Sequence, residues 1–104
     1  MSRLQTITSI VTREFKLHYV DDFKKEKLED IDINDTITGI AQDIYITVEN
    51  EVYHIGGELK YLEICYMEKV LEGLIEETIM VQLYGKNYLQ DNKEVTEAKL
   101  KGEL

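Results

Sequence analysis

Apolar and polar residues alternate in several short stretches of this chain, which is the spacing of half-buried β-strands. The clearest stretch covers residues 43–48, where Ile44, Ile46 and Val48 share one face. A short polar loop separates it from a second alternating stretch over residues 52–55. The pattern therefore predicts a β-hairpin in the middle of the chain.

Gly56 and Gly57 follow the hairpin, and this pair can adopt the positive φ angles of a tight turn. A third strand begins after them, so we expect an antiparallel meander over residues 43–66. The apolar parity changes at Tyr61 and Leu62, which indicates either a β-bulge or a change into helix there.

Two further strands are predicted outside the meander, near residues 10–20 and 79–84. In the first, apolar residues alternate with threonine, lysine and histidine. The pattern leaves open whether residues 4–9 belong to the same strand. The second is an apolar run that closes at Gly85.

Helical spacing is expected mainly over residues 67–77, where apolar residues recur every three or four positions. A hairpin that turns at Glu72 and Gly73 is the alternative for this stretch. Residues 23–31 form a shorter candidate helix. The predicted fold class is α+β, a small antiparallel sheet packed with one or two short helices, and all-β is the alternative.

The domain organisation follows from length and composition. The chain has 104 residues, with no internal repeat and no Pro/Gly/Ser linker, so residues 1–104 are predicted to form a single domain. The polar residues 92–104 are expected to be a frayed tail.

Charge is concentrated in the centre of the chain. Residues 21–77 contain 16 acidic side chains and five lysines, a net charge of −11, whereas the whole chain carries −9. Such a surface repels phosphates and attracts basic surfaces. Direct binding to nucleic acid is therefore disfavoured, and a basic or nucleic-acid-binding protein becomes the expected partner.

The sequence shows no pattern typical of catalysis or of metal binding. His18 and His54 lie in predicted strands, and Cys65 is the only cysteine, expected as a buried thiol. Residues 30–38 resemble an EF-hand calcium loop in their alternate oxygen-bearing side chains, but Asp35 and Ala41 stand where glycine and glutamate are needed. We interpret them as an acidic strand or loop and predict a non-enzymatic protein without cofactor or metal.

Seven of the nine aromatic residues are tyrosine, a residue common in interfaces. In the predicted meander Tyr45 and Tyr53 are cross-strand neighbours, and they either form an exposed patch or cover the second sheet face under a helix. The candidate partner-binding residues are these two tyrosines and ten acids: Asp21, Asp22, Glu26, Glu29, Asp30, Asp32, Asp35, Glu68, Glu72 and Glu76.

Three functions fit these observations. The first is a small acidic protein–protein interaction domain, encoded by a phage or mobile element, that forms a homo-oligomer through its sheet. The second is an acidic mimic of nucleic acid that inhibits a host nucleic-acid-binding protein. The third is a structural component of a virion or conjugation apparatus. The sequence has no signal-peptide pattern and no apolar run that could cross a bilayer, so no membrane association is expected and the cytoplasm is the predicted location.

Overall fold

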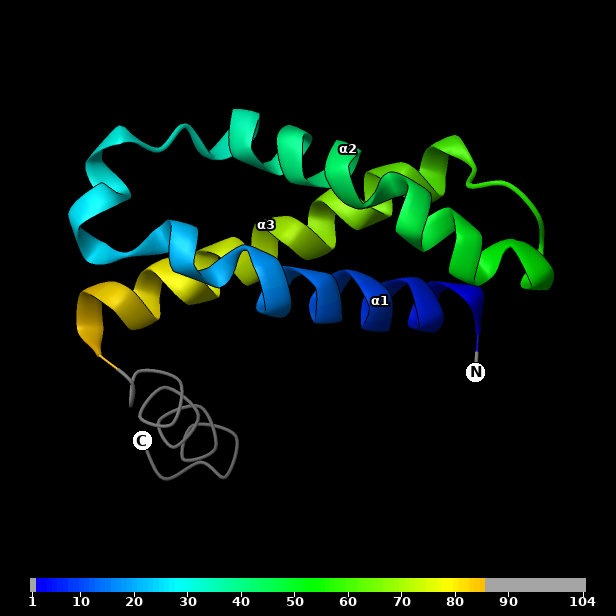
Figure 1. Cartoon of the computed structure of the whole chain (residues 1–104), viewed down its shortest axis with the longest axis horizontal. Helices are drawn as coiled ribbons and strands as arrows, with labels where there is room; N and C mark the ends of the chain where they lie inside the picture. Colours follow the sequence, from blue (N-terminus) through cyan, green and yellow to red (C-terminus); the bar gives the residue numbers. More distant parts are fainter. Residues whose placement is uncertain (1, 86–104) are drawn as a thin grey trace, which may run out of the picture.

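The computed structural model describes residues 2–85, and this part of the chain is a bundle of three α-helices (Figure 1). α1 and α2 run side by side, and α3 crosses both of them obliquely. Three short 3₁₀ helices lie in the two connections. The elements in chain order are α1 (Arg3–His18), η1 (Val20–Phe23), η2 (Lys25–Asp30), α2 (Ile33–Val52), η3 (Tyr53–Ile55) and α3 (Tyr61–Tyr84).

The predicted α+β fold is wrong, and so is the all-β alternative, because residues 2–85 contain no β-strand. The expected meander over 43–66 corresponds to the second half of α2, η3, a loop and the start of α3. The strand expected near residues 10–20 lies mostly in α1, and the strand expected at 79–84 lies wholly in α3.

Burial along α2 explains why the alternating pattern was misleading. Ile44 and Val48 are buried, but Ile46 between them is 60% exposed, so the three do not share a face. The buried residues instead recur at helical spacing. They are Ile37, Ile40, Ala41, Ile44, Val48 and Val52.

α1 shows the same change of period. Its buried residues, Ile7, Ile10, Val11 and Phe15, follow helical spacing, and the predicted alternation ignored the first two. Ser2 begins the helix with a capping box, in which its hydroxyl accepts a hydrogen bond from the Gln5 backbone N–H at 3.1 Å. Residues 4–9 thus belong to a helix that begins well before the predicted strand.

α3 is the element that sequence spacing predicted best. A helix over residues 67–77 is confirmed, and the hairpin alternative at Glu72 and Gly73 is wrong. The helix is longer than expected at both ends. It begins at Tyr61, so the parity change there is a change into helix and not a β-bulge.

The weak helix expected over residues 23–31 is instead divided between the end of η1 and η2. The two are separated at Lys24, whose backbone is extended (φ −64°, ψ 145°). Phe23, just before it, is fully buried and packs its ring against Phe15 with centroids 5.8 Å apart. The expected frayed tail at 92–104 lies outside the described residues.

The three helices enclose one apolar core, and every buried residue among those described is apolar. Met67, Leu71 and Ile75 form the α3 side of this core and are fully buried. Burial of such side chains contributes roughly 1.5–3 kcal/mol each before chain entropy is counted. The core therefore fixes which sides of α2 and α3 remain available to solvent.

Arg3 ties the two ends of the α2–α3 connection to α1. Its guanidinium donates hydrogen bonds to the Val52, Gly57 and Glu58 carbonyls at 3.0, 2.9 and 2.8 Å, and to both carboxylate oxygens of Glu63. We call these five residues the Arg3 cluster. It holds the start of α3 against the end of α2 and so sets how the two helices diverge.

Within residues 2–85, no helix combines the length and the apolar character needed to cross a membrane.

Candidate functional site: an acidic groove between α2 and α3

A shallow groove runs along α2 and α3, and no residue of α1 lines it. It consists of three successive hollows of about 450, 290 and 470 Å³. The first two share Thr38 and Glu68 as walls, so they are continuous. The third hollow shares no lining residue with the other two and lies further along the same two helices, at Ile33 of α2 and residues 73–80 of α3. We call this feature the α2/α3 groove.

The floor of the groove is apolar at both ends. Ala41, Ile46 and Ile64 line the first hollow, and Ile33 and Met80 line the third. Ile46 is 60% exposed and Ile33 is 40% exposed, although both are large aliphatic side chains. Covering such surface contributes about 25 cal/mol per Å² of apolar area. The groove therefore offers a driving force for association with another apolar surface.

The α3 wall of the groove is acidic. Glu68, Glu72 and Glu76 follow one another at four-residue spacing, so they form a row along one side of the helix. Lys69 is the one basic residue among those that line the three hollows, and its Nζ lies 3.7 Å from Glu72 Oε2. A surface bridge of this kind neutralises little, because both side chains are largely solvated.

The α2 wall carries no positive charge at all. This helix contains four acids and neither lysine nor arginine. Asp32 caps its N-terminus, where a carboxylate oxygen accepts a hydrogen bond from the Asp35 backbone N–H at 3.0 Å. These two acids stand beside Ile33 and Asn34 of the groove, so the acidic stretch around residue 32 approaches the acidic row of α3.

The capping role of Asp32 also corrects the interpretation of residues 30–38. They are neither an acidic strand nor a loop throughout, because α2 begins at Ile33. Successive side chains from there on point in helical directions, whereas an EF-hand loop turns alternate oxygens toward one ion. Among the described residues, no three or more histidine, cysteine or acidic side chains form a group that could hold a metal ion.

Tyr45 lies in the first hollow and not on a sheet face. Its hydroxyl donates to Glu49 Oε2 at 3.0 Å, and the same oxygen accepts from the Leu59 backbone N–H at 3.2 Å. The hydrogen bond to this carboxylate raises the pKa of Tyr45. Tyr53 is 59% exposed in η3, so the predicted cross-strand pairing of Tyr45 and Tyr53 is wrong.

The acids expected to bind a partner divide into two groups. Asp32, Asp35, Glu68, Glu72 and Glu76 line the groove or directly adjoin its lining residues. The other five are exposed on η1 and η2, at the end of the bundle away from η3 (Figure 1). They are Asp21, Asp22, Glu26, Glu29 and Asp30.

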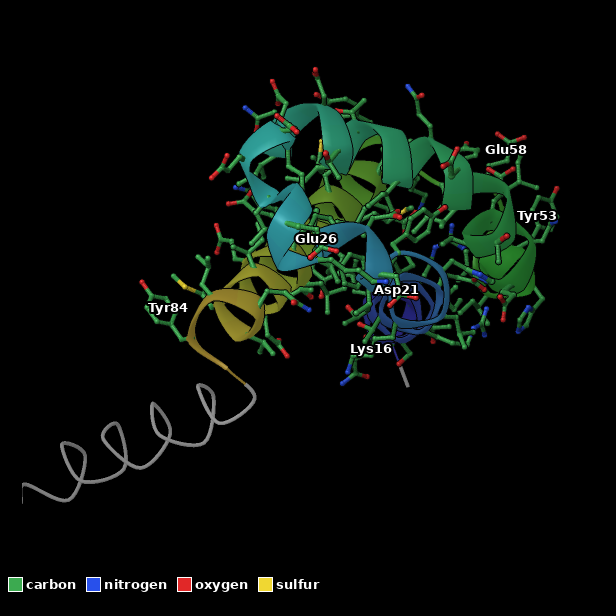
Figure 2. All side chains as sticks on the ribbon, turned by 60° about the vertical axis from the view of Figure 1, so that its left-hand side comes forward. Lys16, Asp21, Glu26, Tyr53, Glu58 and Tyr84 are labelled. Atoms are coloured by element: carbon green, nitrogen blue, oxygen red, sulfur yellow. The ribbon has the colours of Figure 1, made fainter. Side chains whose placement is uncertain are left out.

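Figure 2 shows the two ends of the bundle with side chains drawn. Asp21 and Glu26 project from one end of the bundle, whereas Tyr53 and Glu58 project from the opposite end. Tyr53 therefore belongs to neither acidic group. The structure brings Tyr45 and Glu68 to one hollow and leaves Tyr53 apart from both.

The two histidines lie in helical elements and not in strands. His18 ends α1, where its Nε2 is 3.3 Å from Glu14 Oε2, and His54 lies in η3. The Arg3 cluster joins the other end of α1 to the end of α2, so the two imidazoles are at opposite ends of the bundle. Neither lines the groove.

Cys65 is half-buried and lines the second hollow, so the expectation of a buried thiol is wrong. Tyr61 lies one turn earlier on α3, and its interaction with the Cys65 thiol raises the pKa of Tyr61. Both residues belong to the exposed side of the first turns of α3.

Sequence reasoning missed the α2 wall of the groove, including Thr38, Gln42 and Ile46. The missed signal is the recurrence of Ile37, Ala41, Ile44, Val48 and Val52 at intervals of four, three, four and four. That spacing turns the intervening residues outward on one helical side, where the groove lies.

Comparison with known protein families, with characterised proteins and with solved structures finds no match for this chain.

Proposed function

We propose that this chain is a non-enzymatic interaction domain that binds a basic protein partner along the α2/α3 groove. The observation that carries the proposal is the combination of an apolar floor, an α3 wall that bears several acids and a single lysine, and an α2 wall without any basic residue. Apolar burial supplies affinity in such a site, and complementary charge supplies orientation and a fast encounter.

The chemistry of the described residues supports binding more than turnover. General acid–base catalysis depends on a carboxyl or imidazole in a desolvated cleft, where its pKa is shifted toward neutrality. Among the described residues no charged side chain is fully buried, and of the groove acids Glu68 and Glu72 are half-buried and Glu76 is exposed. The groove contains no imidazole or serine beside its cysteine and carboxylates.

Homo-oligomerisation through a sheet is no longer a hypothesis, because the described residues form no sheet. Self-association through another surface is tested by sedimentation-velocity centrifugation over a wide range of protein concentrations. A sedimentation coefficient that stays at the monomer value leaves a different protein as the partner.

The experiment that tests the proposal is capture of partners from a lysate of the cells that make this protein. The bait is the wild-type chain, and the matched bait carries Glu68→Gln, Glu72→Gln and Glu76→Gln. We expect a basic protein that is retained at low salt, released at high salt and lost from the matched bait. Capture that is equal on both baits contradicts the proposal.

Nucleic-acid mimicry is a second candidate, because two acidic segments far apart in sequence adjoin the same groove. Asp32 and Asp35 are next in sequence to Ile33 and Asn34 of the α2 lining, and the Glu68–Glu76 row lies on the α3 wall. Duplex DNA presents one negative charge per ~1.7 Å of axis, so a mimic must present a comparable series of carboxylates. A captured partner that binds either DNA or this protein, but never both together, supports mimicry, and simultaneous binding contradicts it.

A further inference from the structure

We infer that the segment received by the α2/α3 groove is a basic amphipathic helix of about 14 residues, which completes a four-helix arrangement. This inference rests on the proposed function and adds the chemistry and shape of the partner segment. Three independent properties of the groove support it.

The first property is length and shape. The α2 wall of the groove extends from Ile33 to Ile46, which spans about 20 Å at the helical rise of 1.5 Å per residue. The hollows succeed one another along two adjacent helices. A third helix that lies over such a furrow inserts apolar side chains at i, i+3 or i+4, and i+7.

The second property is polarity across the groove. Its apolar floor lies between acidic borders, with Glu68 and Glu72 on α3 and Asp35 just outside the lining of α2. A helix with leucine-type residues on one face and lysine or arginine at the flanks satisfies both features at once.

The third property is like-charge repulsion within α3 that a single lysine offsets only in part. Like charges at i, i+4 destabilise a helix, and Glu68, Glu72 and Glu76 make two such pairs in succession. Only Lys69 forms an ion pair with this row among the described bridges. A cationic helix placed alongside α3 relieves this repulsion. The charge pattern therefore lowers the stability of the free protein and suits a basic partner.

The test uses fluorescently labelled synthetic peptides and the full 104-residue chain. One peptide of about 14 residues has leucines at i, i+3, i+4 and i+7 spacing and lysines elsewhere. A second has the same composition in an order without that spacing, and a third replaces lysine by glutamate. We expect fluorescence anisotropy to show the first peptide binding at least tenfold more tightly than the other two.

Variants with matched controls locate the binding site. Ile46→Lys places a charge on the exposed floor, and Leu17→Lys makes the same change at a 68% exposed position on α1. Glu76→Lys reverses a groove charge, and Glu26→Lys reverses an exposed charge on η2. We expect the first of each pair to weaken binding, by roughly fivefold for the charge reversal, and the second to leave it nearly unchanged.

Glu76→Lys also separates a role in binding from a role in stability, because it is expected to change the two in opposite directions. It converts the Glu72–Glu76 repulsion into a Glu-to-Lys pair at i, i+4 in the favourable orientation. The free variant is therefore expected to unfold at a higher urea concentration than wild type while it binds the peptide more weakly. A variant that loses stability and affinity together contradicts the inference.

The outcomes separate the inference from the proposed function. If the two lysine peptides bind equally and Glu26→Lys weakens both, the partner surface is the acidic η1–η2 end. In that case the protein still binds basic partners, but the inference about the groove is wrong. If no lysine peptide binds, the inference and the proposed function are both wrong. NMR tests the two other possible occupants. If the amide signals of the groove shift on dilution without peptide, a second copy occupies the groove; if the groove contacts residues 86–104, the chain itself does. Either result overturns the inference.

Discussion

Arg3 Nε lies 2.6 Å from Glu63 Oε2, so a charged hydrogen bond joins the first turn of α1 to the first turn of α3. Both side chains are mostly buried, with exposed fractions of 14% and 13%. Their contact therefore acts in a poorly solvated environment, where breaking one partner leaves an unpaired charge. It fixes the N-terminal end of α3, and hence one end of the α2/α3 groove.

Replacing Arg3 by methionine is predicted to destabilise the fold by about 3 kcal/mol, because Glu63 and three backbone carbonyls lose their donor. Arg3→Lys is expected to recover only part of this loss, since one ammonium cannot reproduce a fork of five donors. Urea unfolding followed by circular dichroism measures both variants.

Arg13→Met is the matched control for Arg3. The Arg13 guanidinium bridges Glu14 and Glu51, but its side chain is 45% exposed. Solvent screens such a bridge, so we expect a much smaller loss of stability than for Arg3→Met. Equal losses in the two variants contradict the role assigned to the Arg3 cluster.

Gly56→Ala is predicted to destabilise the protein by about 1–3 kcal/mol, because Gly56 has a φ of 144° and an added Cβ would lie 2.7 Å from Arg3 Nη1. Gly39 provides the opposite case. It lies within α2, where an added Cβ would meet no atom within 4 Å beyond the backbone of its own helix. Gly39→Ala should therefore stabilise by about 0.5–1 kcal/mol. Thermal unfolding distinguishes the two signs.

Stability is predicted to fall as the pH drops below about 4.5, because hydrogen bonds from Arg3 hold the pKa of Glu63 below its usual range. Arg13 lowers the pKa of Glu51 in the same way. A carboxyl whose pKa is lower in the folded state contributes stability above its unfolded pKa and loses it as the pH falls through the folded pKa. Urea midpoints at several acidic pH values measure this slope.

Glu63→Gln isolates the contribution of that carboxyl to acid unfolding. We expect the variant to be less stable than wild type at neutral pH and to lose less stability on acidification. A slope identical to that of wild type shows that the Arg3–Glu63 contact does not govern acid unfolding.

Asp32→Ala is predicted to cost about 1 kcal/mol, because the N-cap of α2 loses its acceptor for the Asp35 N–H. Asp32→Ser retains an oxygen acceptor and should recover most of that loss. The stability of wild type is expected to be the same with calcium or with a chelator. Calcium-dependent stabilisation that disappears in Asp32→Ala points to a cation site and contradicts the capping role.

The sequence was informative about α3 and misleading about α2, for a physical reason. β-branched residues such as Ile44, Ile46, Thr47 and Val48 favour strands by local propensity, and here they also alternate with polar residues. Packing decided otherwise, because only a helix buries Ile37, Ala41, Ile44, Val48 and Val52 together. Over residues 67–77 propensity and spacing agree, so the helix was predicted.

The candidate site was predictable in chemistry but not in position. The acidic character of Asp35, Glu68, Glu72 and Glu76 was visible in the composition of the central block. Their common groove depends on the crossing of α2 and α3, which arises from long-range packing and from the Arg3 cluster. Without the α2 helix, Ile46 and Thr38 could not be recognised as part of the same surface.

Hydrogen–deuterium exchange of the full chain, alone and with its captured partner, tests most directly whether the α2/α3 groove is the binding surface. We predict slower exchange in peptides that cover residues 33–46 of α2 and 61–77 of α3, and unchanged exchange in the outer turns of α1 around Leu17. Protection confined to α1 or to the η1–η2 segment would show that the partner binds elsewhere.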